Sequence, residues 1–425
     1  MILFLLTSLF FRLLGLNASA IWYDQAISRY RAQHMLLLGN YWDMLLVPFS
    51  NGPLWLMRIP AFLFSILALW LAWKLMDALA FTRRQRITSC IALAILPGLI
   101  WMAQDARCYA ALSCAYLAAV WFAVKDRPLG LAAMVGLLAY LHMTGMGLAA
   151  AALFVALNQI SVRRTALAAL GTIAWIPLLI MYVLKSEDSS AALFWLKEFD
   201  PFKTLGQAAF VNTVPGVVAG FFILLAMVCM VWRKELHPIY RIAAFPLIIL
   251  IVFSVLVAPV MYYRPLMPIL IPLCLLFGAG LTPSRPGWWR WIPAGIAACL
   301  LFFGVINWDP SARGGHVDEM AVMIDANWQE GDQLVYATGT VAEPLDFYLH
   351  RPGCILDWTT NPNLTLPSMD LEWPECPPGT PQAGRTWLIW PDDPLLTAQR
   401  PEGLLVASSW GGWEFPRIDV ILIEK

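Results

Sequence analysis

Polar side chains of the kind that do chemistry stand at the ends of several long apolar segments. The set comprises Asp24, Arg58, the run Gln104-Asp105-Ala106-Arg107-Cys108-Tyr109, His142 and Arg264. Ionisable groups are costly next to hydrocarbon, and those that occur there usually have a function. All of these residues can be placed on one face of a bilayer. The sequence therefore indicates an active site at a membrane surface.

Asp24 is the strongest candidate for a catalytic residue in this set. It lies in Ile21-Trp22-Tyr23-Asp24-Gln25-Ala26, just before an amphipathic stretch at 26–38. Trp and Tyr residues flank this stretch, which is typical of a helix lying in the membrane interface. A carboxylate held there can deprotonate a hydroxyl group while a lipid-linked substrate approaches from the side. The same carboxylate can equally serve only as a helix cap, and spacing does not decide between the two roles.

Eleven apolar runs have roughly the length that crosses the hydrocarbon core of a bilayer. They are 1–16, 54–75, 87–103, 109–124, 129–142, 145–160, 165–184, 214–232, 242–260, 265–282 and 291–307. Treating 129–160 as two helices, with a break at 141–145, places the short loops rich in Lys and Arg on one side. The positive-inside rule makes that side the cytoplasm. We therefore expect a cytoplasmic N-terminus, an uncleaved signal anchor as first span, and the polar candidates outside.

The composition supports this interpretation. The chain is 60% hydrophobic and only 13% charged, which is far from the average of soluble domains. Its formal net charge of zero argues against nucleic acid as a partner. It contains neither a Gly-rich phosphate loop nor a zinc-spaced Cys/His cluster. We predict a polytopic α-helical membrane domain over 1–307.

The sequence after residue 307 changes to a mixed, Pro-punctuated pattern that predicts an extracytoplasmic α/β domain over 308–425. Periodicity predicts helices at 316–328 and 344–349, strands at 333–337, 386–390, 404–408 and 418–423, and a loop at about 353–383. Cys354 and Cys376 are the only cysteines of this domain, and we expect them to form a disulfide in an oxidising compartment. We interpret the domain as a lid or acceptor-recognition module without chemistry.

Four motifs carry a resemblance to a known family. They are Trp22-Tyr23-Asp24-Gln25-Ala26; Gly52-Pro53-Leu54-Trp55 with Arg58-Ile59-Pro60-Ala61; Gln104-Asp105-Ala106-Arg107-Cys108-Tyr109; and Tyr263-Arg264-Pro265 with Pro268. In this order, over about 20–280, they resemble Trp-x-Asp-Glu-Ala, Pro-Pro-Leu with Arg-Leu-Pro-Ser, Gln-Glu-Ala-Arg-x-Tyr and Arg-Tyr before a downstream Pro. These motifs belong to membrane glycosyltransferases of the C-type fold that use polyprenyl-phosphate sugars. That group includes protein O-mannosyltransferases, aminoarabinose transferases and lipopolysaccharide galacturonosyltransferase-like proteins.

The resemblance implies a role for each candidate. Asp24 is implied as catalytic base, and Arg264, Arg58 and Arg107 as ligands of the donor phosphate. A guanidinium suits that task because it offers a planar fork of donors and stays charged near lipid. Arg58 can instead be an interface anchor whose charged group reaches water, and Arg107 can pair with Asp105 instead of binding substrate. The residues implied to contact substrate, or to support those that do, are Asp105, Tyr109, His142, Gln25 and Asp43. Two departures stand out: Gln25 replaces a Glu of the family, and Asn51-Gly52-Pro53 replaces a His or Pro-Pro element.

The resemblance implies inverting transfer of a sugar from a polyprenyl-phosphate donor to a glycan, lipid or protein acceptor. A transporter or flippase of lipid-linked sugars is one alternative, although transporters tend to bind substrate near the midplane. An oligosaccharide ligase that uses a lipid pyrophosphate is another. A divalent cation is compatible with the sequence, because Asp24, Asp43 and Asp105 can supply oxygen ligands if they converge. We also expect Asp24, 104–109, His142 and Arg264 to line one cavity, with a hydrophobic groove for the polyprenyl tail.

Overall fold

The computed structural model describes residues 2–17, 20–21, 23–33, 41–184, 200–211, 213–231, 233–256, 263–280, 292–309, 316–337, 339–349, 351–355, 376, 385–391, 403–409 and 418–424. The chain forms two compact units. The first, here called the helical unit, comprises Met1–Leu16 and Ala32–Asp309; the second, the sheet unit, comprises Asn17–Arg31 and Pro310–Lys425. The sequence predicted a boundary between 307 and 308. It did not predict that 17–31 would group with the C-terminal residues.

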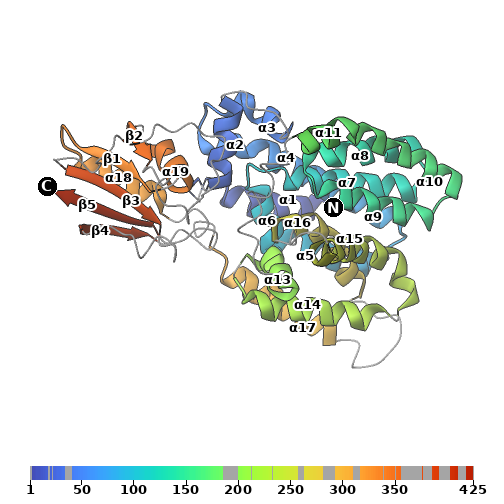
Figure 1. Ribbon diagram of the computed structural model, residues 1–425. Helices are drawn as coiled ribbons and strands as arrows, with labels where there is room; N and C mark the ends of the chain where they lie inside the picture. The colour runs from blue at the N-terminus through green and yellow to red at the C-terminus, as the bar shows by residue number, and fades with distance from the viewer. Residues whose placement is uncertain are drawn as a thin grey trace. The chain divides into compact units, whose positions relative to one another are not determined.

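The helical unit consists mainly of α-helices (Figure 1). Its α-helices are α1 (Ile2–Leu14), α3 (Tyr41–Leu46), α4 (Leu54–Ala78), α5 (Arg83–Ile95), α6 (Pro97–Ala103), α7 (Tyr109–Val124), α8 (Pro128–Leu141), α9 (Gly145–Leu157), α10 (Val162–Ala169), α11 (Ile176–Leu184), α13 (Pro201–Phe210), α14 (Gly216–Val231), α15 (His237–Leu256), α16 (Tyr263–Gly280) and α17 (Ile292–Ile306). The 3₁₀ helices are η1 (Val47–Phe49), η2 (Leu170–Trp175) and η4 (Lys234–Leu236). Each predicted apolar run is helical over the residues that the structure describes. The break between α8 and α9 confirms that 129–160 forms two helices.

Several helices are suited to a bilayer. Among the described residues, four helical stretches are long and apolar enough to cross one: Leu54–Ala78, Val162–Ile180, Lys234–Leu256 and Tyr263–Gly280. α5 and α6 pass the same test as a pair, although the chain bends by 59° between them. Other apolar helices in the described part of the chain, among them α7, α8, α9 and α14, are 10–17 residues long. The apolar helices and the composition indicate an integral membrane protein. The total of eleven spans stays a prediction.

The bend between α5 and α6 explains a buried charge in α1. Pro97 has no N–H group, so it cannot donate to the Leu93 carbonyl one turn earlier. Arg12 supplies the missing donor: its Nη2 lies 3.2 Å from Leu93 O, and its Nη1 lies 3.1 Å from Ser8 O. Hydrogen bonding to carbonyls reduces the cost of burying this guanidinium, which is only 1% exposed. Arg12, a charge inside the first predicted apolar run, therefore stabilises the broken helix beside it.

The sheet unit contains a five-stranded mixed sheet of order β2-β1-β3-β5-β4 (Figure 1). The strands are β1 (Gln333–Tyr336), β2 (Gly353–Ile355), β3 (Arg385–Pro391), β4 (Leu404–Ser409) and β5 (Ile418–Glu424). β1 pairs in parallel with β2 and β3, while β5 pairs antiparallel with β3 and β4. The helices of the unit are α2 (Tyr23–Gln33), whose last two residues belong to the helical unit, α18 (Val317–Asn327) and α19 (Gly339–Leu349). Every predicted strand of this domain is present, whereas β2 was missed within the predicted loop.

The alternation of side chains along β1 divides the core of the sheet unit in two. Leu334 and Tyr336 pack with the apolar residues of α18 and α19 on one face. Val335 and Ala337 pack with Cys376 on the other face. Successive side chains of a strand point to opposite faces, so a fully apolar strand buries both. β1 is accordingly an inner strand of the sheet, between β2 and β3.

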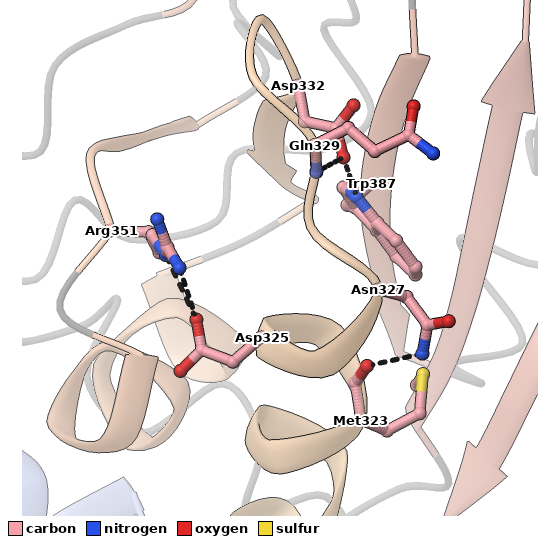
Figure 2. Close-up of polar contacts among 7 residues, drawn as sticks. All are labelled: Met323, Asp325, Asn327, Gln329, Asp332, Arg351 and Trp387. Atoms are coloured by element: carbon pink, nitrogen blue, oxygen red, sulfur yellow. Dashed lines mark hydrogen bonds and ion pairs between the residues drawn. The ribbon is translucent and has the colours of Figure 1, made fainter.

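Polar contacts fix the turn between α18 and β1 (Figure 2). Asp332 Oδ2 accepts hydrogen bonds from the Gln329 backbone N–H at 2.9 Å and from Trp387 Nε1 at 2.8 Å. The Arg351 guanidinium forms an ion pair with Asp325 at 2.9 Å. Both of these side chains are partly exposed, so this pair contributes little to stability. The Asp332 contacts are the more important because they connect the turn to β3.

α2 packs within the sheet unit. The Ile21 N–H donates to Tyr348 Oη of α19 at 2.9 Å, and the Arg29 guanidinium lies 4.4 Å from the centre of the Phe347 ring. The apolar side chains Ala26 and Ile27 are buried, at 4% and 5% exposure. The apolar face of this helix therefore packs against protein, and its position in the membrane interface stays a prediction. Residues 34–38 of that prediction lie outside the described residues.

Cys354 of β2 and Cys376 form a disulfide with their Cα atoms 4.9 Å apart. The Cys376 N–H also donates to Ile355 O at 2.9 Å. The two cysteines are separated by 22 residues. In the chain-entropy model, closing such a loop stabilises the folded state by roughly 3 kcal/mol.

Replacing both cysteines by Ser is expected to destabilise the sheet unit by roughly 2–4 kcal/mol. The measurement is thermal unfolding of the purified protein, with Cys229→Ser/Cys299→Ser as the matched control because both of those thiols are exposed and free. Unfolding temperatures that fall equally in the two double variants would show that the disulfide contributes nothing specific.

Candidate active site

The segment 104–108 connects α6 to α7 and lies at the centre of the candidate site. Gln104 is 6% exposed, and its Nε2 donates to Phe11 O at 3.3 Å and to Arg12 O at 3.1 Å. These carbonyls belong to the last turn of α1, which has no further helical donors for them. Gln104 therefore caps α1. The fit is close, because a Cβ atom on Gly15 would lie 2.6 Å from Gln104 Nε2.

Arg58 contacts the same end of α1 from the second turn of α4. Its side chain is fully buried, and Nη1 donates to Leu16 O at 2.8 Å. A cation is favourable there because carbonyl groups and the negative end of the helix dipole meet at a C-terminus. Arg58 is thus not an interface anchor that extends into water. Its structural role is to hold the end of α1, and its predicted phosphate contact stays a prediction.

α3 brings a second carboxylate to the segment. Trp42 Nε1 donates to Ala106 O at 3.1 Å, which fixes α3 against the 104–108 connection. Asp43 and Asp105 are both fully buried. The pKa of the Cys108 thiol is raised to about 12, mainly by burial; Arg107 lowers it, while Asp43 and Asp105 raise it. The three charged groups therefore act on one thiol and lie near one another, and Cys108 stays protonated at neutral pH.

His142 follows the last residue of α8 and faces the start of α7. Its Nδ1 accepts the Thr144 N–H at 3.2 Å and lies 2.8 Å from Thr144 Oγ1. A backbone N–H can only donate, so the neutral ring carries its proton on Nε2. The ring centroid lies 5.8 Å from that of Tyr109. His142 therefore orders the corner between α8 and α9 beside the candidate segment.

Arg264 lies in the first turn of α16 and is held by its neighbour. Arg264 Nε donates to Tyr263 Oη at 2.8 Å. The Tyr263 side chain is 1% exposed, and its ring packs against Trp101 of α6 with centroids 5.9 Å apart. Because Trp101 precedes Gln104 by one helical turn, this contact joins the start of α16 to the central segment. Arg264 is half-buried, and its guanidinium is oriented by Tyr263.

An apolar cavity of about 440 Å³ lies beside α16. Side chains of α5, α13, α14, α16 and α17 line it, together with Leu96 between α5 and α6, and we call it the apolar groove. Leu270 and Leu273 of α16 are among them. Leu270 comes six residues after Arg264, about 9 Å along the helix axis. The groove and the oriented guanidinium thus belong to the same helix.

α13 forms one wall of the groove and was not predicted from the sequence. It passes very close to α6: a Cβ atom on Gly98 would lie 2.0 Å from Ala208 O. A residue larger than glycine at position 98 would separate the two helices. The Leu-Pro-Gly sequence at the α5–α6 bend, together with the Asp-Pro start of α13, was the available signal. Asp200 caps α13 by accepting the Lys203 N–H at 2.9 Å.

The structure brings together most of the predicted residues of the helical unit. Arg58, Asp43, the 104–109 run and His142 meet around one segment, and Trp101 connects Arg264 to it. Asp24 and Gln25 lie in α2, within the sheet unit. Asp24 is the second residue of α2 and so lies inside its first turn, not at the N-cap; its side chain is outside the described residues. Gln25 is buried.

The predicted common cavity for Asp24 and Arg264 stays a prediction, because these residues belong to different units. No group of three His, Cys, Asp or Glu side chains is arranged to hold a metal ion in the part of the chain that the structure describes.

Comparison with known proteins gives a match at the level of fold. No family model and no curated protein sequence matches the chain. Two solved structures of ArnT from Cupriavidus metallidurans are similar to it, each with a TM-score of 0.53 and covering 99% of this chain and 97% of theirs. One is the apo state, at 14% identity, and the other is bound to undecaprenyl phosphate, at 13% identity. The chain therefore has an ArnT-like fold over nearly its whole length.

Proposed function

We propose that the protein is an inverting glycosyltransferase that uses a polyprenyl-phosphate sugar. The observation that carries this proposal is the position of Arg264 at the start of α16, a helix whose following turns line the apolar groove. A guanidinium next to a groove matches a donor that has a phosphate joined to a long apolar tail. Each buried CH₂ group of that tail contributes about 0.8 kcal/mol. The ArnT-like fold supports the proposal, because one ArnT structure holds undecaprenyl phosphate.

The proposed reaction is a single displacement. The acceptor hydroxyl oxygen attacks the anomeric carbon, the bond from that carbon to the phosphate oxygen breaks, and polyprenyl phosphate leaves. Asp24 takes the proton of the hydroxyl, and Arg264 stabilises the charge that develops on the phosphate. Attack opposite to the leaving group inverts the configuration. Phosphate is already a good leaving group, so positioning and charge stabilisation are the main contributions required of the protein.

The proposed location is the plasma membrane of a bacterium, with the N-terminus in the cytoplasm and the site on the outer face. The distribution of Lys and Arg among the loops supports this orientation. The acceptor is a glycan, lipid or protein that reaches this face. Asp43 and Asp105, both buried near Arg107, are proposed to support the substrate-binding groups.

The test is a transfer assay with purified protein in lipid nanodiscs. Undecaprenyl-phosphate sugars are supplied with envelope extract as acceptor, and the products are separated by mass spectrometry. We expect undecaprenyl phosphate to accumulate while the sugar appears on an acceptor with inverted configuration. Movement of intact donor across vesicle membranes without cleavage would favour a flippase. Consumption of only pyrophosphate-linked glycans would favour a ligase.

A further inference from the structure

A second cavity lies at the turn between α7 and α8, separate from the candidate active site. It has a volume of about 640 Å³ and is lined by Trp121, Phe122, Lys125, Asp126, Arg127, Pro128, Leu129, Gly130 and Arg164. We propose that this cavity binds the phosphate headgroup of an anionic glycerophospholipid. The proposed glycosyl transfer makes no use of it.

The turn itself sets the positions of the charges. Arg127 N donates to Phe122 O at 2.9 Å, and Asp126 N donates to Ala123 O at 3.2 Å. This pair of bonds is the Schellman arrangement that ends many helices, with its left-handed residue at Asp126 (φ 53°). The backbone of 125–127 is therefore fixed by α7. Lys125 and Arg127 on either side of Asp126 extend from a defined turn.

The charge balance of the cavity is positive. Arg164 forms an ion pair with Asp126, which neutralises the only acidic side chain in the lining. Lys125 and Arg127 are exposed, and neither makes an ion pair with any other described residue. The first turn of α8 adds backbone N–H groups that have no partner within the helix. Two cations beside a helix N-terminus favour an anion, and a phosphate fits this set of donors.

The apolar part of the lining selects a lipid over free phosphate. Trp121 and Phe122 form one wall, and Leu129 is 73% exposed at the rim. A Cβ atom on Gly130 would lie 2.6 Å from the Phe122 ring, so the ring packs directly on the first turn of α8. A dissolved phosphate gains nothing from such a wall, whereas the glycerol and upper acyl groups of a phospholipid do. Basic pockets between helices on the cytoplasmic side suit anionic headgroups, and this loop is predicted to be cytoplasmic.

The experiment measures lipid binding to the detergent-purified full-length protein by native mass spectrometry. Dioleoylphosphatidylglycerol is titrated against dioleoylphosphatidylcholine. The Lys125→Gln/Arg127→Gln variant is expected to weaken phosphatidylglycerol binding by about tenfold or more, since each basic side chain near an anionic headgroup contributes measurably. Asp126→Asn is expected to strengthen it a few-fold, because Asn also tolerates the left-handed conformation and Arg164 is then released to the headgroup.

The matched control is Arg83→Gln/Arg84→Gln, which removes two exposed charges from the start of α5, outside the cavity. This variant is expected to bind phosphatidylglycerol as the unmodified protein does. Equal weakening in the two double variants, or equal binding of both lipids by the unmodified protein, would overturn the proposal. Displacement of bound lipid by millimolar inorganic phosphate would overturn it too, since the cavity would then be a site for free phosphate.

Discussion

Replacing Asp24 by Asn is expected to reduce sugar transfer by about 100- to 10,000-fold, the usual contribution of a general base. The amide keeps the size and polarity of the side chain but cannot accept the proton of the acceptor hydroxyl. Binding of undecaprenyl phosphate is expected to stay unchanged, because Arg264 lies on another element. The measurement compares turnover under saturating donor with donor binding in the same preparation.

The matched control for Asp24→Asn is Asp318→Asn. Asp318 is the second residue of α18, as Asp24 is of α2, and both helices belong to the sheet unit. Asp318 is exposed, and its substitution removes an acidic group from the first turn of a helix, worth about 0.3–1 kcal/mol. Asp318→Asn is expected to leave transfer unchanged. Substantial turnover in Asp24→Asn, or equal losses in both variants, would remove Asp24 from the role of base.

Replacing Arg264 by Ala is expected to weaken binding of undecaprenyl phosphate by about ten- to a hundredfold. A hydrogen bond to a charged group contributes about 1.5–3 kcal/mol, and the alanine variant loses that contact. Arg264→Lys keeps the charge without the planar fork and is expected to lose less. Tyr263→Phe removes the hydroxyl oxygen that accepts the hydrogen bond from Arg264 Nε at 2.8 Å. The affinity of this variant for undecaprenyl phosphate should lie between those of the unmodified protein and the Arg264→Ala variant.

The control for Arg264 is Arg83→Ala, an exposed arginine at the first residue of α5. Its affinity for undecaprenyl phosphate is expected to equal that of the unmodified protein. If Arg264→Ala also retains full affinity, the phosphate must be bound elsewhere, and Arg107 becomes the first candidate to replace it.

The sequence predicted the helices well because their signal is local. Apolar runs and the break at 141–145 lie within one stretch of chain, and no distant residue is needed to recognise them. The strands β1, β3, β4 and β5 were likewise predicted from local sequence pattern. α13 and β2 were missed because each is short and lacks a long apolar run. The pairing of β2 with β1 depends on tertiary contacts that local pattern does not contain.

The roles of individual site residues depend on partners far away in the sequence. Trp42 contacts Ala106, and Arg58 contacts Leu16, across separations of 64 and 42 residues. From the sequence, Arg58 had two open roles, phosphate ligand and interface anchor. Its complete burial excludes the second. The packing of Ile21 and Arg29 on α19 is likewise a long-range contact, and it joins the start of α2 to the sheet unit.

A structure of the protein with undecaprenyl phosphate, determined by electron cryomicroscopy in nanodiscs, is the most direct test of the proposed donor site. We predict that the phosphate lies within hydrogen-bonding distance of the Arg264 guanidinium and that the isoprenoid tail occupies the apolar groove between α5, α13, α14, α16 and α17. A phosphate bound away from the start of α16, or a tail that leaves the groove empty, would contradict the proposal.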